Sequence, residues 1–201
     1  MKTLTWKQFT INGIQPEEKK TSMTVGIFDG VHLGHQALLK SIVSYNVNYT
    51  PVVITFRENH KTEKIKTAKT GKAEKIKNSV IEIHNFQERL RLFGEFGIKE
   101  TIVIDFTEEF KQMPGNDFLE ILLKQGNIGY FAIGGNFRCG RKLDTDAEKI
   151  EKFFMSQNIP AGIVPEVMEG LLPVSSSRIR AAIADGDTKL AEKMLGRKYL
   201  S

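Results

Sequence analysis

Apolar residues along the chain follow two alternating patterns. Short runs rich in β-branched residues predict buried strands, and the segments between them carry apolar residues at the spacing of one helix face. Strands separated by helices predict an α/β fold, a doubly wound parallel sheet of about five strands with helices on both faces. The predicted strands are residues 21–28, 51–56, 100–106, 130–134 and 162–167, and the predicted helices are residues 32–45, 86–96, 116–124, 146–157, 177–184 and 187–195.

The length and composition fit that fold. The 201 residues, 40% of them hydrophobic, suit one globular domain over residues 1–201, which ends in a helical segment, residues 175–201. The apolar runs are far shorter than the roughly 20 residues that span a bilayer, and the beginning of the chain is mixed and polar. We therefore expect neither contact with a membrane nor an export signal. A single cysteine, Cys139, excludes an internal disulfide and suits the reducing cytoplasm, where we expect the protein to be located.

The net charge of +5 comes from one stretch of the chain. Residues 57–78 hold eight Lys and Arg residues against three Glu residues, whereas the remainder has 21 positive and 21 negative charges. The region 57–85 is thus predicted to be a basic, flap-like loop. Three interpretations stay open: a solvated loop, a flap that attracts anionic substrates, and a contact with nucleic acid. Because the body is neutral, we expect no nucleic-acid partner.

The strongest chemical signal is the string G-I-F-D-G-V-H-L-G-H at residues 26–35, where a predicted strand turns through glycine into a helix. Ligands of parallel sheets bind at this edge, beyond the carboxyl ends of the strands. The first turn of a helix offers free backbone N–H groups and the positive end of its dipole, which favour phosphate. Two histidines at this spacing also occur by chance. In this setting, however, His32 and His35 lie on one side of the helix and can donate hydrogen bonds to charged oxygens.

Two later segments show similar chemistry. The string G-G-N-F-R-C-G, residues 134–140, follows the fourth predicted strand, and Asn136 offers both a donor and an acceptor. The alternative for it is a plain turn that tolerates a left-handed Asn. Residues 175–180, S-S-S-R-I-R, begin a helix, so one serine can cap it. The remaining hydroxyls, with Arg178 and Arg180, predict an oxyanion receptor.

Taken together, these strings resemble a known family. Residues 26–35 resemble the phosphate-binding motif of the HxGH nucleotidyltransferase superfamily, and more closely the G-x-F-D-G-V-H-x-G-H start of the bacterial FAD synthetases. In the same order, residues 88–97, 134–140, 174–180 and 195–199 resemble further strings of that family's FMN adenylyltransferase domain. The resemblance implies a Rossmann-like fold and the reaction ATP + FMN → FAD + pyrophosphate. It also implies Mg²⁺ as the cofactor, with ATP and FMN as the small-molecule partners.

The resemblance implies a role for each matching residue. The catalytic residues would be His32, His35, Ser177 and Arg180, with the histidines at the α-phosphate and the other two at the leaving pyrophosphate. The ATP-binding residues would be Gly26, Phe28, Asp29, Gly30, Gly34, Ser175, Ser176 and Arg178. The FMN-binding residues would be Asn136, Phe137, Phe56 and His60, and Asn136 would also contact the metal. Asp29 has two interpretations, ordering of the phosphate loop or capping of it alone.

The sequence departs from the family in three ways. The family's F-x-P-H-P is here F-R-E-N-H, so His60 is either a substitute for the lost histidine or a solvated loop residue. Cys139 replaces a phenylalanine and is interpreted as a packing residue. The chain ends at Ser201, so we expect no riboflavin kinase activity and a separate riboflavin kinase that supplies FMN. Two alternatives remain: an adenylyltransferase for another phosphate acceptor, and a non-catalytic nucleotide- or flavin-binding protein.

Overall fold

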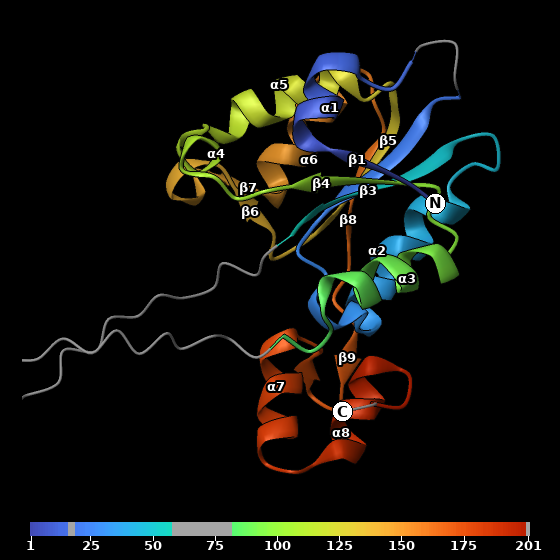
Figure 1. Cartoon of the computed structure of the whole chain (residues 1–201), viewed down its shortest axis with the longest axis vertical. Helices are drawn as coiled ribbons and strands as arrows, with labels where there is room; N and C mark the ends of the chain where they lie inside the picture. The colour runs from blue at the N-terminus through green and yellow to red at the C-terminus, as the bar shows by residue number, and fades with distance from the viewer. Residues whose placement is uncertain (16–18, 58–81, 200–201) are drawn as a thin grey trace, which may run out of the picture.

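The computed structural model describes residues 1–15, 19–57 and 82–199. Within these ranges one parallel sheet has six strands in the order β1-β4-β3-β2-β5-β8 (Figure 1). The strands are β1 (Lys2–Thr5), β2 (Thr21–Val25), β3 (Thr50–Phe56), β4 (Glu100–Ile104), β5 (Ile128–Gly134) and β8 (Ala161–Val164). The predicted α/β fold is confirmed, and β1 is the strand of this sheet that the sequence did not indicate.

Helices cover both faces of the sheet, as Figure 1 shows. One face packs against α1 (Trp6–Asn12), α5 (Gly115–Gln125) and α6 (Ala147–Ser156), and the other packs against α2 (Leu33–Ser44) and α3 (Phe86–Glu95). Side chains alternate across β3 to serve both layers: Val52 and Ile54 join the first core, and Val53 joins the second. All three are fully buried, which is why the strand is apolar at successive positions.

The sheet reverses its direction of growth at β2. From β2 the chain moves to one side through β3 and β4, and it then returns to the other side of β2 with β5 and β8. The carboxyl ends of β2 and β5 therefore flank the topological switch point, the place where open α/β sheets bind their ligands. The histidine string follows β2 and the glycine-rich string follows β5.

The last part of the described chain packs beyond this edge of the sheet. It consists of a short hairpin, β9 (Met168–Glu169) with β10 (Leu172–Pro173), and two helices, α7 (Ser176–Ala184) and α8 (Thr188–Leu195). These helices enclose a small apolar core of their own, on which Leu33 from α2 and Ile83 also pack. The helical segment is thereby joined to the start of α2.

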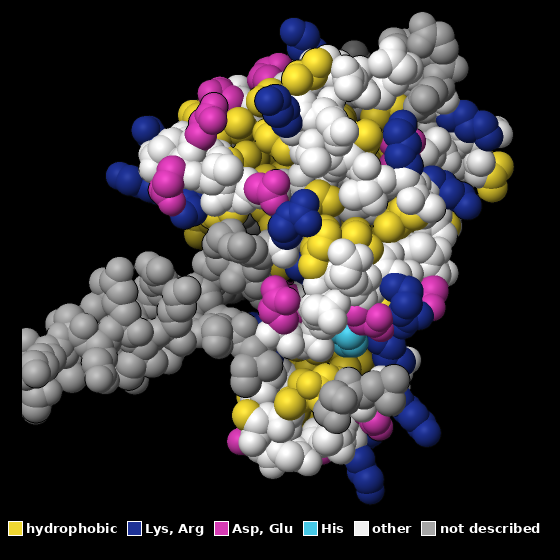
Figure 2. Space-filling view, viewed as in Figure 1, with side chains coloured by type: hydrophobic (Ala, Val, Ile, Leu, Met, Phe, Trp, Pro, Cys, Tyr) yellow, Lys and Arg dark blue, Asp and Glu magenta, His cyan; other side chains and the backbone are white. Residues whose placement is uncertain are grey.

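Other elements are short. α4 (Glu108–Gln112) links β4 to α5, and β6 (Arg138–Cys139) pairs antiparallel with β7 (Thr145–Asp146). Basic and acidic side chains are interspersed over the face drawn in Figure 2. None of the helices in the described ranges is long and apolar enough to cross a membrane. Most of the basic loop, including His60, lies outside the described residues.

Candidate functional site

The turn after β2 has an unusual backbone. Phe28, Gly30 and Val31 have φ angles of 57°, 81° and 39°. Glycine adopts such angles freely, but a β-branched residue such as Val31 does so only when its surroundings impose it. The side chains of Phe28 and Val31 are completely buried, so packing holds this strained turn in place. It ends at His32, which is the residue that caps α2.

The two histidines form one unit at the start of α2. Their rings stack with centroids 3.6 Å apart, and Phe28 contacts the His35 ring edge-on with the centroids 5.2 Å apart. His32 Nδ1 accepts a hydrogen bond of 3.4 Å from the His35 backbone N–H. That bond requires an unprotonated Nδ1, so the neutral His32 ring carries its proton on Nε2.

Both imidazoles are held in the neutral form. Burial, and then the positive charge of Arg197, lower the pKa of His32 from 6.5 to about 4. Burial also lowers the pKa of His35 well below its usual value, with His32, Arg89 and Arg197 adding to the shift. At neutral pH the pair therefore offers N–H donors without bringing a positive charge.

Asp29 connects the turn to two other parts of the chain, α7 and the segment before α3. Its Oδ2 atom accepts a 2.6 Å bond from Arg180 Nη1, and its Oδ1 atom accepts the Ile83 N–H at 3.0 Å. Its backbone carbonyl accepts the Ser176 hydroxyl at 2.9 Å. The carboxylate is almost fully buried. Asp29 thus orders the turn, which supports the first of the two interpretations given for it.

A second helix begins beside the first. Ser175 caps α7 by accepting the Arg178 N–H at 3.3 Å, and Arg180 Nη2 donates to Ser177 Oγ at 3.5 Å. The N-terminal turns of α2 and α7 contribute residues to the same cavity. Two helix N-termini, with their N–H groups and the Arg180 guanidinium, make this region attractive to a polyphosphate.

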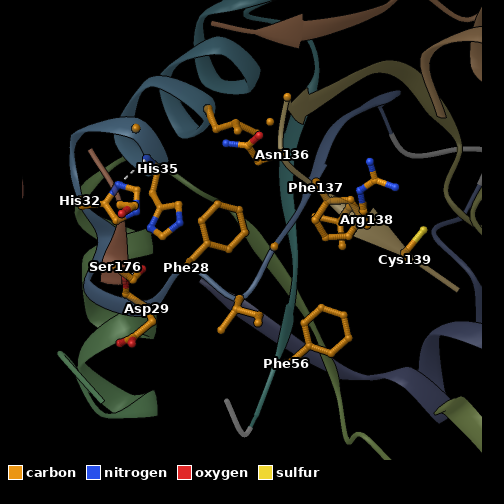
Figure 3. Close-up of a pocket in the computed structure, with 18 of the residues that line it drawn as sticks. Phe28, Asp29, His32, His35, Phe56, Asn136, Phe137, Arg138, Cys139 and Ser176 are labelled. Atoms are coloured by element: carbon orange, nitrogen blue, oxygen red, sulfur yellow. Dashed lines mark hydrogen bonds between the residues drawn. The ribbon is translucent and has the colours of Figure 1, made fainter. Parts of the chain in front are cut away.

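The cavity at the switch point has a volume of about 690 Å³. In Figure 3, His32, His35, Asp29 and Ser176 gather on one side, whereas Phe56, Phe137 and Cys139 lie on the other, with Phe28 between them. The first side is polar and basic, and the second is aromatic. We call these the phosphate lobe and the aromatic lobe. The predicted site residues that line the cavity are Gly26, Phe28, Asp29, His32, Gly34, His35, Phe56, Asn136, Phe137, Ser175, Ser176, Ser177 and Arg180.

Two of the predicted site residues do not line the cavity, and a third is outside the described residues. Gly30 is buried in the turn and does not line the cavity, and His60 is outside the described residues. Arg178 also does not line the cavity. Its guanidinium donates to the carbonyls of Pro173 at 2.7 Å and Leu172 at 2.9 Å, so it fixes the β9–β10 hairpin. Its predicted direct contact with ATP stays a prediction.

Much of the aromatic lobe was not predicted from the sequence. This lobe is completed by Phe106, Phe110, Lys111, Met113, Phe118 and Leu143. Phe106 lies two residues after the end of β4, so its place at the end of the predicted strand 100–106 was the available signal, but the rings on α4 and α5 carry no motif. Cys139 lines this lobe, and burial raises the pKa of its thiol to about 12, so it is unreactive and its predicted packing role fits.

Asn136 and Glu166 lie at the mouth of the cavity, on the loops that follow β5 and β8. The Asn136 amide nitrogen donates to the Glu166 carboxylate. Among the described residues no group of three or more His, Cys, Asp or Glu side chains could hold a metal ion. Magnesium, however, usually binds through one or two protein oxygens together with substrate phosphates. The Asn136 amide and the Glu166 carboxylate, in the same cavity as the phosphate lobe, fit that mode of binding.

The fold and the site define a class of protein: an α/β protein with a doubly wound parallel sheet whose switch point holds a cavity lined by a histidine pair and by residues of two helix N-termini. The family model described as FAD synthetase matches residues 14–178. The chain therefore belongs to the FAD synthetase family.

Individual relatives agree with this. The chain is 27% identical over 187 residues to the bifunctional riboflavin kinase/FMN adenylyltransferase of Escherichia coli strain K12, a match that covers 92% of this chain and 57% of that protein. It is 24% identical over 188 residues to the FAD synthetase of Listeria monocytogenes, covering 91% of this chain and 71% of that one. A crystal structure described as a macrolide-efflux protein from Streptococcus pneumoniae superposes with a TM-score of 0.79 at 26% identity, over 99% of this chain and 72% of that chain. The chain spans less than two thirds of the length of the bifunctional relatives.

Proposed function

We propose that this chain is an FMN adenylyltransferase that joins ATP and FMN to give FAD and pyrophosphate, and that residues 1–201 act as one nucleotidyltransferase domain. One observation supports this above the others: a phosphate lobe and an aromatic lobe share a single cavity of about 690 Å³. That volume lies within the range of small-molecule and cofactor sites. Two phosphate-bearing substrates, one with a large flat ring, match this division.

In the proposed reaction, a phosphate oxygen of FMN attacks the α-phosphorus of ATP, and the bond from that phosphorus to the β-phosphate oxygen breaks. The FMN phosphate becomes part of the new pyrophosphate bridge, and the β- and γ-phosphates leave together. The step requires no covalent bond to the protein. Catalysis would then consist of positioning the two substrates and stabilising the charge on the transferred group.

The phosphate lobe would bind ATP. The N-terminal turn of α7 offers the backbone N–H groups of Ser176 and Ser177 and the hydroxyl groups of Ser175 and Ser177, and Arg180 adds a positive charge for the leaving pyrophosphate. His32 and His35 would donate N–H groups to the α-phosphate oxygens. Because both rings are neutral, the hydrogen bonds can strengthen as the oxygens gain charge, without a strong ion pair in the ground state.

The aromatic lobe would hold the isoalloxazine ring of FMN among Phe56, Phe106, Phe110 and Phe137, since flat rings pack well against aromatic side chains. Asn136 and Glu166 would lie near the FMN phosphate and would hold Mg²⁺ together with the substrate phosphates. When bound, the metal ion would neutralise charge on the reacting phosphates. We further infer that the protein works in the cytoplasm, without nucleic-acid or membrane partners.

A single incubation tests the proposal. Purified protein is mixed with ATP, FMN and MgCl₂, and the products are separated by liquid chromatography while pyrophosphate is measured by a coupled assay. The expected result is FAD and pyrophosphate in equal amounts. If FAD does not form while another phosphate compound is adenylylated, the assigned acceptor is wrong. If no acceptor is adenylylated although ATP binds, the chain is a nucleotide-binding protein.

A further inference from the structure

Arg197 lies outside the cavity but contacts the strained turn that carries the histidines. Its Nη1 atom donates to the carbonyl of Val31 at 3.0 Å, and its Nη2 atom donates to the carbonyl of Gly30. Nη1 also donates to the carbonyl of Leu195 at 3.1 Å, at the end of α8. One guanidinium therefore joins the turn after β2 to the C-terminal helix, across more than 160 residues of sequence.

Gln36 makes a second bridge between the carbonyls of Val31 and Leu195. Its Nε2 atom donates to Val31 at 3.0 Å and to Leu195 at 2.7 Å, and its side chain is buried. Gly196, between Leu195 and Arg197, packs closely against α2. A Cβ atom added there would lie only 2.6 Å from Leu33 Cδ2. The end of α8 thus packs against the first turn of α2, and the side chains of Gln36 and Arg197 donate hydrogen bonds to both segments.

These bonds act on the part of the turn that is under strain. Val31 has a positive φ, which is unfavourable for a β-branched residue unless its surroundings compensate. Hydrogen bonds from a charged donor are about twice as strong as neutral ones. Arg197 satisfies the carbonyls at and directly before this residue, so it stabilises the conformation that places His32 at the cap of α2.

We propose that Arg197, together with Gln36, is a positioning residue for the histidine pair: it holds residues 30 and 31 against the end of α8, so that His32 and His35 keep their orientation toward the cavity. This inference rests on the proposed function in one respect, that the histidines act on the α-phosphate. The geometry itself does not depend on the identity of the substrates. Arg197 does not line the cavity and therefore acts through the turn rather than on the substrate.

The surroundings of His32 provide an independent readout. The titratable and charged groups near it are His35, stacked on its ring, and Arg197, while Asp29 and Arg180 line the same cavity. Burial is the larger cause of the lowered pKa of His32, and the positive charge of Arg197 is the second. If Arg197 is replaced by a neutral side chain and the turn relaxes, both causes weaken, so the pKa of His32 should rise from about 4 toward 6.5.

The experiment compares four single variants, and the double variant Arg197→Met/Gln36→Leu, with the wild-type chain. Arg197→Met removes the donors, Arg197→Lys keeps the charge but offers a single ammonium group, and Gln36→Leu removes the second bridge. Lys198→Met is the matched control, because it removes one positive charge from the exposed neighbouring residue. Each variant is assayed for kcat and for the KM of ATP, and the His32 ring is followed by NMR between pH 3.5 and 8. Circular dichroism checks the fold.

For Arg197→Met we expect kcat to fall by about 10- to 100-fold with a smaller change in KM, because a misplaced catalytic group loses rate rather than binding. Arg197→Lys should be intermediate and Lys198→Met unchanged. Since Arg197 and Gln36 share two acceptors, the loss in the Arg197→Met/Gln36→Leu double variant should be smaller than the product of the single losses. The NMR midpoint of His32 should rise in Arg197→Met only.

Two results would overturn the inference: an unchanged kcat in folded Arg197→Met, or an unchanged His32 midpoint. If Arg197→Met does not fold, the comparison of Arg197→Lys and Gln36→Leu with Lys198→Met decides in the same way. A failure of the proposed function would give a different result. In that case the wild-type chain makes no FAD, and the NMR titration alone shows whether Arg197 positions His32.

Discussion

The Asp29 carboxylate and the Arg180 guanidinium form an ion pair of 2.6 Å that joins the turn after β2 to α7. The Asp29 side chain is 4% exposed and that of Arg180 is 19% exposed, so water screens the pair poorly. The pair has a structural and an electrostatic role. It holds the N-terminal turns of α2 and α7 together, and it aims a cation at the cavity that both helices line.

Breaking this pair from one side should destabilise the protein. Asp29→Asn leaves a partly buried guanidinium without its charge partner, so we expect the free energy of unfolding to fall by about 2–4 kcal/mol. The KM of ATP should rise as well, because α7 loses its anchor. Urea denaturation and steady-state kinetics measure the two effects. The double variant Asp29→Asn/Arg180→Gln should recover part of the stability but not the activity, and full additivity of the two losses would contradict a direct pair.

The histidine pair should act mainly on the rate. His35→Ala and His32→Ala each remove one donor from the phosphate lobe, and the loss of such a donor typically lowers kcat by about 100- to 1000-fold. The KM of ATP should change far less. His84→Ala is the control, because its side chain does not line the cavity. A histidine variant with normal kcat and a raised KM would show that the pair serves binding of the ground state instead.

The neutral state of His32 should make the fold sensitive to acid. The pKa of His32 is about 4 in the native protein and about 6.5 in the unfolded chain. Between these values the unfolded chain binds a proton that the native protein does not, so stability falls as the pH drops from about 6.5 to 4. The pKa difference between the two states corresponds to a loss of about 3 kcal/mol in the free energy of unfolding when His32 is fully protonated.

Urea denaturation at pH 7.0 and pH 4.5 measures this loss. The reference is His32→Gln, which keeps an amide near the cap but has no group that titrates in this range. Stability should fall more between the two pH values in the wild-type chain than in His32→Gln. Equal losses in the two proteins would show that His32 does not cause the acid sensitivity.

The aromatic lobe should determine affinity for the flavin. Phe110→Ala removes a ring that lines the cavity and packs against Phe106 and Phe118. Loss of an aromatic contact costs about 0.5–1.5 kcal/mol beyond the buried area, so the KM of FMN should rise up to about tenfold while the KM of ATP stays constant. The control is Phe153→Ala, because Phe153 lies on α6 outside the cavity. Equal increases in both KM values would argue against the assigned lobe.

The sequence predicted the parts of this site that depend on local patterns. Apolar periodicity identifies β2 and α2, and the string at residues 26–35 joins them, so its place at the carboxyl end of a strand could be predicted. Ser175 caps α7, as its position before a predicted helix indicated. The fold class followed from the same periodicity. Strand β1 was missed because its four residues alternate only weakly and lie at the edge of the sheet, where burial does not select apolar side chains.

Contacts between distant segments could not be predicted in this way. Arg178 and Arg180 are two residues apart and were assigned to the same ligand, yet one fixes a hairpin and the other pairs with Asp29. Which arginine faces the cavity depends on the rotation of α7 against the turn after β2. Similarly, the string at residues 195–199 indicated only a family resemblance, and only the packing of α8 on α2 shows which carbonyls Arg197 binds.

The contact between residues 28–36 and 175–197 also affects the order of folding. The six strands of the sheet and α2 all precede Ser176, Arg180 and Arg197, the partners of the turn, in the sequence, so they are synthesised before them. Until then the carbonyls of Gly30 and Val31 lack these donors, and Leu33 lacks the apolar core on which it packs. A nascent chain would thus acquire its sheet first and its phosphate lobe last, and a transition state that already contained this long-range contact would be slow to reach.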